Sequence, residues 1–395
     1  MHQPAGPAGG NPEAARAAAR SKNQTLVFMR IAIIIGTRPE AIKLIPLYTE
    51  LRSRGASVEL ILFGQHIEMV RQIVDFFGVT PDEELSVMRP NQQLATLSAE
   101  LLLALNDLFT RKSFDCVVVQ GDTTTAMIAT LAAFYRGIDV AHVEAGLRTY
   151  NLQSPFPEEA NRQIIGRMAR WNFAPTGGAA ENLVREGVSG VQVVGNTVID
   201  SLLYCAARVT ADESRYVEHF PWIAKADRLV LITGHRRENF NDGANGILEA
   251  ITLLAERHPD ITFYYPVHLS PKVQVPVQRA LSHLPNVILD RPLAYDELVF
   301  FMKKSFLILT DSGGIQEEAP SLRIPLIVLR DTTERPEGIE RGCAVLAGTG
   351  KDAIVHHFEE ISGNKELYER MAAAGNPYGD GTASLQIADA LLAEG

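Results

Sequence analysis

The chain has 395 residues, a length that favours two domains over one. Its hydrophobic content of 46% and charged content of 21% are ordinary for a globular protein. The net charge of −10 argues against a nucleic-acid partner, so an anionic substrate would need a local positive field. No apolar run approaches the length of a membrane span, so we expect no membrane partner.

The three cysteines, Cys116, Cys205 and Cys343, are far apart and have no metal-binding spacing. We therefore predict no metal site from them. Cys116 lies inside an apolar run and is expected to be a small core residue. This usage of cysteine fits a reducing compartment, which favours the cytoplasm.

Residues 1–28 differ from the rest of the chain. The first 20 are mostly Ala, Gly, Pro and Asn, without the apolar segment of a secretory signal. We expect a disordered leader. Met29 stands directly before the first apolar run, so the folded part is expected to begin there.

The chain then repeats one pattern, in which an apolar run ends in a polar turn and a helical stretch follows. The first run, 31–35, is continuously apolar, which marks a strand buried on both faces of a parallel sheet. Similar runs follow at 58–63, 116–119, 139–143, 171–174 and 191–194. Repeated units of this kind predict a doubly wound parallel sheet.

A second set of such runs begins near Arg228. Its members are 229–232, 262–265, 287–289, 306–309 and 326–329. The fold class predicted is therefore α/β, with two Rossmann-like domains, 29–199 and 200–376, that face each other across a cleft. A last helix within 377–395 could pack on either domain.

The segment 310–320 (TDSGGIQEEAP) predicts a nucleotide site. It follows an apolar strand, and Gly313 and Gly314 leave a turn open to a ligand before a helix begins. A helix N-terminus after a glycine turn suits a phosphate. Glu317 or Glu318, one turn further on, could accept hydrogen bonds from ribose hydroxyls. The alternative is an ordinary turn with two solvated acids.

No stretch contains the dinucleotide fingerprint G-x-G-x-x-G, and the first strand is followed by the single Gly36. The sequence therefore offers no support for bound NAD, and no cofactor is predicted.

Polar side chains gather at the carboxyl ends of the predicted strands, the edge where open α/β sheets bind ligands. In the first domain these are the carboxylates Asp122, Glu144 and Glu158. Each one alone could be a helix cap or a solvated acid. The nearby basic residues His142, Arg148 and Arg162 favour a site.

In the second domain His235 ends a strand and could act as an acid or base near neutral pH. Arg236 and Arg237 follow it and would suit phosphate, since guanidinium binds such oxygens bidentately. His268 holds a similar position. The alternative here is a charged, solvated loop.

Nine motifs stand in order along the chain and together resemble the non-hydrolysing bacterial UDP-N-acetylglucosamine 2-epimerases. They lie at 36–43, 121–125, 142–148, 157–162, 195–200, 233–238, 311–320, 330–336 and 376–381. The resemblance covers the chain from Met29 to its end and leaves out only the leader.

This resemblance implies a glycosyltransferase-B-like fold and a homodimer. It assigns catalysis to four residues: Asp122, Glu144, Glu158 and His235. It places nucleotide and substrate contacts on Arg38, Lys43, Arg148, Arg236, His268, Ser312, Gly313, Gly314 and Glu318. Some members of the family carry a second, activating substrate site, which would fall on Gln65, Arg236 and His268; Glu68 stands where some such members have Gln.

The reaction implied is the reversible interconversion of UDP-N-acetylglucosamine and UDP-N-acetylmannosamine, which supplies a sugar for cell-surface polysaccharide. The C1–O bond breaks first, 2-acetamidoglucal forms beside UDP, and re-addition protonates C2 on the other face. Two proton carriers are expected among Asp122, Glu144 and Glu158. His235 and Arg38 would support the departing UDP.

Four other functions are compatible with the sequence. They are a UDP-sugar glycosyltransferase, a hydrolysing 2-epimerase, a nucleotide-sugar sensor without turnover, and a 2-epimerase for a related UDP-acetamido sugar or uronic acid.

The leader yields a first prediction. A chain that begins at Met29 is expected to fold and to keep full activity, because the resemblance and the first strand both start there. Expression of this truncated chain, with thermal unfolding and turnover measured beside the full chain, tests this. Loss of either property would show that residues 1–28 are needed.

Overall fold

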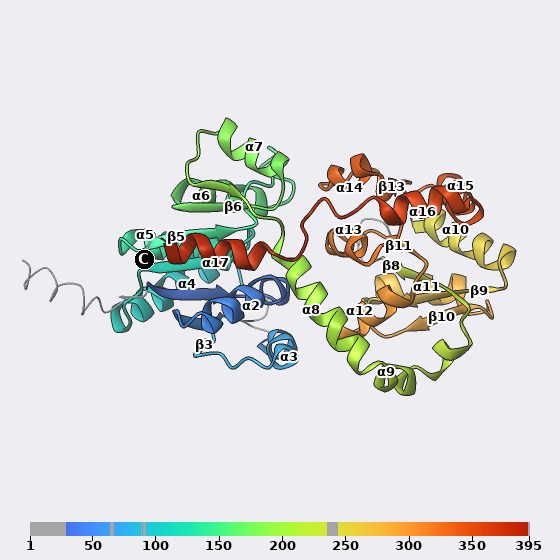
Figure 1. Ribbon diagram of the computed structural model, residues 1–395, viewed down its shortest axis with the longest axis horizontal. Coiled ribbons are helices and arrows are strands. Elements are labelled where there is room, and N and C mark those ends of the chain that lie inside the picture. The colour runs from blue at the N-terminus through green and yellow to red at the C-terminus, as the bar shows by residue number, and fades with distance from the viewer. Residues whose placement is uncertain (1–28, 64–66, 88, 90–91, 235–243, 394–395) are drawn as a thin grey trace, which may run out of the picture.

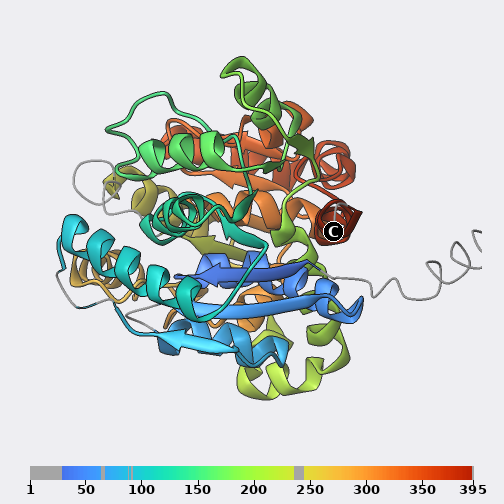
Figure 2. The same cartoon turned by 90° about the vertical axis from the view of Figure 1, so that its left-hand side faces the viewer.

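The computed structural model describes residues 29–393 except 64–66, 88, 90–91 and 235–243 (Figure 1). Two parallel sheets, each covered by helices, form two domains that lie side by side (Figures 1 and 2). The predicted fold class is confirmed.

The first domain contains a sheet of seven parallel strands in the order β3-β2-β1-β4-β5-β6-β7. The strands are β1 (Arg30–Ile35), β2 (Ser57–Phe63), β3 (Glu83–Leu85), β4 (Cys116–Gln120), β5 (Asp139–Val143), β6 (Trp171–Ala174) and β7 (Val191–Val193). The helices are α2 (Arg38–Ser53), α3 (Ile67–Phe77), α4 (Leu94–Arg111), α5 (Thr124–Tyr135), α6 (Glu158–Met168) and α7 (Gly177–Arg185).

The second domain contains six parallel strands in the order β10-β9-β8-β11-β12-β13. They are β8 (Arg228–Thr233), β9 (Ile261–Pro266), β10 (Val287–Asp290), β11 (Leu307–Thr310), β12 (Leu326–Val328) and β13 (Ala344–Leu346). Its helices are α9 (Glu213–His219), α10 (Ala244–Arg257), α11 (Pro271–Leu281), α12 (Tyr295–Lys304), α13 (Gly313–Glu318), α14 (Pro336–Arg341), α15 (Lys351–Gly363) and α16 (Lys365–Ala373), with 3-10 turns at Pro221–Lys225 and Ala319–Leu322.

All strands predicted from apolar runs are present. Two strands escaped prediction, β3 and β13, which are both edge strands of three residues. A short edge strand is covered less completely than a central one, so β3 needs no continuous apolar run, whereas β13 is apolar but only three residues long. Glu83 and Glu84 of β3 show this directly, because they are half-buried or exposed.

Both sheets reverse their strand order at one place. In the first sheet the reversal lies between β1 and β4, and in the second between β8 and β11. Ligands of doubly wound sheets bind outside the carboxyl ends of the strands at such a reversal. The fold therefore marks two half-sites, one after β1 and β4 and one after β8 and β11.

The chain crosses between the domains twice. Helix α8 (Thr197–Ala211) leads into the second domain, and α17 (Ala383–Ala393) returns to pack against α2 and α8 (Figure 1). The backbone N–H of Asn196 donates to the carbonyl of Tyr378 at 2.7 Å where the crossings meet. Gly195 and Gly379 both have positive φ, and a Cβ on Gly195 would lie 3.3 Å from the Cα of Gly379. The two crossing segments are therefore in backbone contact.

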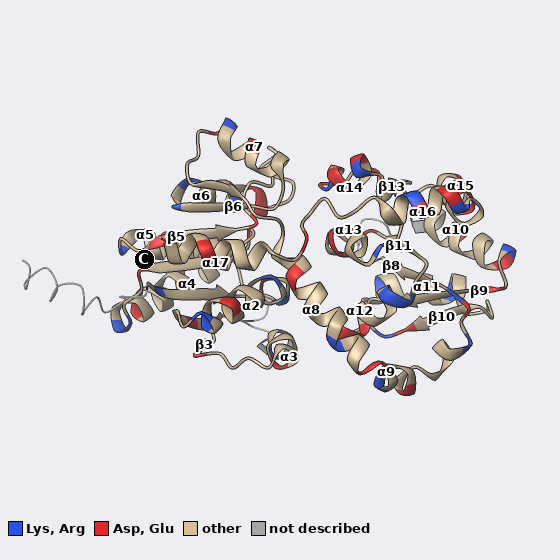
Figure 3. Ribbon diagram, in the orientation of Figure 1, with Lys and Arg blue, Asp and Glu red and all other residues tan. Residues whose placement is uncertain are grey.

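The core follows the expected pattern. Phe263, Tyr264 and Tyr265 are fully buried strand residues and do not form a stacking surface. The three cysteines are buried and free. Charged residues of both signs are spread over both domains (Figure 3). Within the described part of the chain, no helix is long and apolar enough to cross a membrane.

Candidate active site

Glu40 of α2 is a buried carboxylate that organises the first half-site. It was not among the site residues predicted from the sequence. It accepts hydrogen bonds from the backbone N–H groups of Gly36 (2.7 Å) and Thr37 (2.6 Å) and from the hydroxyl of Thr123 (2.6 Å). It therefore ties the turn after β1 to the turn after β4. The signal was present, since Thr37 followed three residues later by Glu40 is a capping box.

Asp122 lies in the turn after β4 and is held by α6. The guanidinium of Arg162 donates from Nε to Asp122 Oδ2 at 3.1 Å, and the amide of Asn161 donates to the Asp122 carbonyl at 2.8 Å. Glu158, the first residue of α6, is four residues before Arg162 and so lies on the same face of that helix. A joint role of Asp122 and Glu158 stays a prediction, supported by the Arg162 that holds Asp122 from the same helix face.

Glu144 follows β5 and is closely constrained by its surroundings. It is buried, and its φ of 63° is unfavourable for a residue other than glycine. Strain of this kind is found at functional sites that their surroundings hold in place. Gln120 donates to its carboxylate at 2.8 Å, and Lys43 of α2 forms an ion pair with it. Burial raises the pKa of Glu144, although the charge of Lys43 opposes this.

His142 and Arg148 have structural partners. His142 is buried on β5, and its Nε2 lies 2.7 Å from the Gly121 carbonyl, so it donates and supports the turn before Asp122. Burial lowers the pKa of His142 to about 4. The guanidinium of Arg148 binds both carboxylate oxygens of Glu186 at 2.7 and 2.9 Å. A substrate contact of Arg148 stays a prediction.

The second half-site lies where β8 and β11 end side by side. The hydroxyls of Thr233 and Thr310 are hydrogen bonded at 2.6 Å, and the Thr310 hydroxyl also accepts from the N–H of Ser312 at 3.0 Å. The glycine turn then opens α13. A Cβ on Gly313 would lie 3.0 Å from Arg335 Cζ, so glycine lets this guanidinium lie against the turn. Like Glu40, Arg335 was not among the site residues predicted from the sequence.

The two acids of α13 are both buried, so the alternative of two solvated acids is wrong. Tyr295 donates to Glu318 Oε1 at 2.7 Å. Burial raises the pKa of Glu318 to about 7. Burial also favours protonation of Glu317, but the charges of Lys43 and Arg335 overcome it and lower the pKa of Glu317.

The two half-sites meet through Lys43. Its ammonium pairs with Glu144 of the first domain and lies 3.7 Å from Glu317 of the second. Glu317 in turn accepts from Arg335 Nε at 2.8 Å. A hydrogen bond from Thr176 to Glu337 at 2.8 Å also joins the domains.

The other predicted site residues differ in what the structure says of them. His235, Arg236 and Gln65 fall outside the described residues. His268 is exposed after β9, where its Nδ1 accepts from the N–H of Ser270 at 3.0 Å. Arg38, the first residue of α2, is half-buried at the first half-site.

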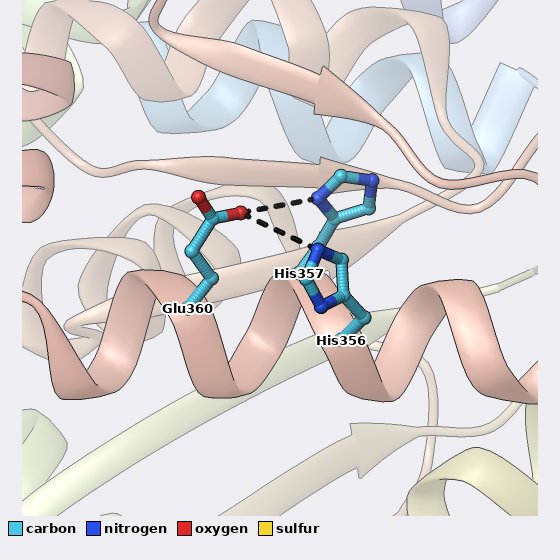
Figure 4. Close-up of side chains that lie close together, drawn as sticks. All are labelled: His356, His357 and Glu360. Atoms are coloured by element: carbon cyan, nitrogen blue, oxygen red, sulfur yellow. Dashed lines mark ion pairs between the residues drawn. The ribbon is translucent and has the colours of Figure 1, made fainter.

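One group of possible metal ligands lies close together among the described residues: His356, His357 and Glu360 on α15 (Figure 4). The Glu360 carboxylate lies 3.9 and 3.8 Å from the two imidazoles. His356 and Glu360 are exposed, and none of the three belongs to either half-site. We interpret the group as surface ion pairs.

Two facing Rossmann-like domains, with carboxylates on one side and a glycine turn with buried acids on the other, define the class of glycosyltransferase-B-like enzymes. The structure of MurG from Acinetobacter baumannii shares this fold with a TM-score of 0.59 at 12% identity. A family model described as UDP-N-acetylglucosamine 2-epimerase matches residues 49–392, and the chain belongs to this family.

Relatives of similar length support this assignment. Proteins named UDP-N-acetylglucosamine 2-epimerase from Campylobacter jejuni and from Escherichia coli K12 are each 44% identical; both matches cover 92% of this chain, and they cover 97% and 98% of those proteins. The structure of the Neisseria meningitidis UDP-GlcNAc 2-epimerase bound to UDP-GlcNAc has a TM-score of 0.87 at 43% identity, over 92% of this chain and 100% of that one. The Methanocaldococcus jannaschii enzyme, in complex with UDP-GlcNAc and UDP, has a TM-score of 0.78 at 32% identity, over 93% of this chain and 100% of that one. The resemblance found in the sequence is confirmed.

The environment of His142 yields a second prediction. Because burial keeps its pKa near 4, its imidazole should stay neutral from pH 5.5 to 8. Imidazole proton NMR over this range, with the His142→Asn variant to assign the signal, should show no titration of His142. A midpoint above pH 5.5 would contradict the prediction.

Proposed function

We propose that this protein interconverts UDP-N-acetylglucosamine and UDP-N-acetylmannosamine by inverting C2 of the sugar. The observation that carries the proposal is the junction at Lys43, which joins the carboxylate half-site to the half-site with the glycine turn. A UDP-sugar needs both halves, since the nucleotide and the reacting sugar lie at opposite ends of one molecule. The names of the relatives supply the sugar.

The second half-site holds the UDP portion. Glu318 accepts hydrogen bonds from the ribose hydroxyls, and the turn Ser312–Gly314 receives the diphosphate. Arg38 and Lys43 supply positive charge from the first domain. The chain is acidic overall, so these two side chains provide the local positive field that a diphosphate needs. Arg335 lies against Gly313 and adds a guanidinium at the same turn.

The sugar lies over the carboxylates of the first half-site. Its C2 proton is not acidic, because no carbonyl is attached to C2. Breaking the C1–O bond sends the electron pair to UDP and gives C1 oxocarbenium character, which carboxylates stabilise. A carboxylate then takes the C2 proton, and the C–H electron pair forms the C1=C2 bond of 2-acetamidoglucal.

Re-addition reverses these steps on the other face. A second acid protonates C2 while a phosphate oxygen of UDP bonds to C1, so atoms and electrons balance without a redox partner. Glu144 suits proton transfer because its burial raises its proton affinity. Asp122 and Glu158, on or beside α6, are the candidates for the other carrier. His235 is proposed to support UDP together with Arg38.

The assembly and location follow the same resemblance. We propose a homodimer in the cytoplasm that supplies a sugar for cell-surface polysaccharide. The three free cysteines are compatible with a reducing compartment. A second, activating substrate site on Gln65, Arg236 and His268 stays a proposal of the same kind.

A third prediction tests the reaction directly. Proton NMR of the protein with UDP-N-acetylglucosamine in D2O should show UDP-N-acetylmannosamine and deuterium at C2 of both sugars. The Asp122→Asn and Glu144→Gln variants should each lose about 100-fold or more in turnover, since each removes a carboxylate from the reacting sugar. Asp139→Asn is the matched control. Asp139 is the first residue of β5 and Glu144 directly follows its last residue, so Asp139 lies at the amino end of the strand, away from the site.

The same spectra separate the other functions. Free N-acetylmannosamine and UDP would indicate a hydrolysing enzyme. Binding without turnover or exchange would indicate a sensor, a transferase that lacks its acceptor, or an enzyme for another UDP-sugar. Near-normal turnover of Glu144→Gln or Asp122→Asn would refute the roles given to those residues.

A fourth prediction concerns Glu318 and pH. A ribose that hydrogen bonds to the charged carboxylate competes with protonation, so affinity for UDP should fall as pH drops below the Glu318 pKa of about 7. Calorimetry should show binding roughly 10-fold weaker at pH 6 than at pH 8 from this group. The Glu318→Gln variant reports the ionisation of UDP itself and serves as reference; equal pH dependence in both proteins would contradict the ribose role.

A further inference from the structure

Four buried charges of alternating sign connect the two half-sites. Starting in the first domain, they are Glu144, Lys43, Glu317 and Arg335. Their side chains are between 3% and 14% exposed, so solvent screens them little. Of the two acids, Glu317 contacts both Lys43 and Arg335, whereas Glu144 contacts Lys43. The reaction proposed above assigns no role to Glu317.

Glu317 is held firmly in this position. One carboxylate oxygen accepts from Arg335 Nε at 2.8 Å. The other accepts from the Asn196 amide at 3.2 Å and lies 3.7 Å from the Lys43 ammonium. The Asn376 amide donates to its backbone carbonyl at 2.8 Å. Asn196 and Asn376 belong to the two interdomain crossings, so Glu317 is anchored where the domains join.

We propose that Glu317 is a positioning residue for the epimerisation: it shares Lys43 with Glu144, which leaves Glu144 able to exchange a proton, and it holds Arg335 against the Gly313 turn. This inference rests on the proposed function for its consequence in turnover. Its structural content, the sharing of one ammonium by two carboxylates, is independent of the substrate.

The physical reason lies in the competition for Lys43. A buried carboxylate that is alone with an ammonium is held as an anion and makes a poor proton carrier, since an opposite charge at this distance lowers its pKa by about 1 to 3 units. When a second carboxylate shares the same ammonium, the ammonium lowers the pKa of the first carboxylate less. The negative charge of the second carboxylate also repels the first and so raises its pKa.

The charged groups that face Glu144 come from three elements. They are Lys43 from α2, Glu317 from α13, and Arg335 from the segment before α14, while Gln120 of β4 is a neutral hydrogen-bond donor. Burial raises the pKa of Glu144 and Glu317 raises it further, whereas the two cations lower the pKa of Glu317 itself. Lys43 and Arg335 also lower the pKa of Glu144, but burial and Glu317 outweigh them, so the pKa values of the two acids shift in opposite directions.

Glu334 provides a matched control. Its carboxylate also pairs with Arg335, at 3.0 Å from Nη1, but it is 33% exposed and is not among the main charges that act on Glu144. A Glu334→Gln change removes one negative charge beside Arg335 and leaves the sharing of Lys43 intact. A purely structural contribution of negative charge near Arg335 would affect both variants alike.

The direct test is titration of the Glu144 carboxyl by 13C NMR in protein labelled at glutamate, with Glu144→Gln to assign the signal. In Glu317→Gln, Lys43 pairs with Glu144 alone, so the midpoint should move down by about 1 pH unit. In Glu334→Gln it should stay in place. An unmoved midpoint in Glu317→Gln, or an equal shift in both variants, overturns the inference whether or not the protein turns over UDP-sugars.

Steady-state kinetics of the same variants tests the effect on turnover. The acid limb of the pH profile for turnover should move to lower pH in Glu317→Gln, and kcat should fall by about 10-fold near neutral pH while KM changes less. Should Glu317→Gln fail to fold, Glu317→Asp, which keeps the charge but shortens its reach to Lys43, should move the midpoint in the same direction by less. No shift in that variant would equally contradict the proposal. Absence of turnover in the unmodified protein would refute the proposed function and leave the NMR result to decide this inference.

Discussion

The structure depends on one ammonium group shared by two buried carboxylates across a domain junction. Lys43 lies on α2 of the first domain, yet it faces Glu317 of α13 in the second domain. A buried charge is costly unless it is paired, so the two domains cannot separate here without exposing or orphaning charged groups. The same pairing brings the carboxylates of one sheet to the glycine turn of the other.

The folding pattern explains why the charges collect at this place. Parallel strands in a doubly wound sheet bring their carboxyl ends to one edge, and the reversal of strand order opens a gap between two neighbouring turns. In the first sheet Glu40 closes that gap structurally by binding the turns after β1 and β4. In the second sheet Thr233 and Thr310 join the corresponding turns. In each half-site, hydrogen bonds therefore tie together the chain at the ends of two neighbouring strands.

Burial and pairing divide the acids into different tasks. Glu40 and Glu159 accept several hydrogen bonds and act within the scaffold. Glu144 combines burial with a strained backbone and a single shared cation, an environment suited to proton exchange. Residue type alone does not separate these roles, since all three acids are glutamates that either follow a strand or lie in the first turn of a helix.

The sequence by itself determined the fold class and nearly every strand, because continuous apolar runs and their polar endings report burial on both faces of a parallel sheet. Its ordered motifs also identified the family, and they pointed to Asp122, Glu144, Glu158 and Glu318. Only the tertiary structure decided the partners of these groups: Lys43 between Glu144 and Glu317, Arg335 over Gly313, and Arg148 on Glu186. The physical reason is that such contacts join residues many positions apart, and their strength depends on burial and distance, which local periodicity does not record.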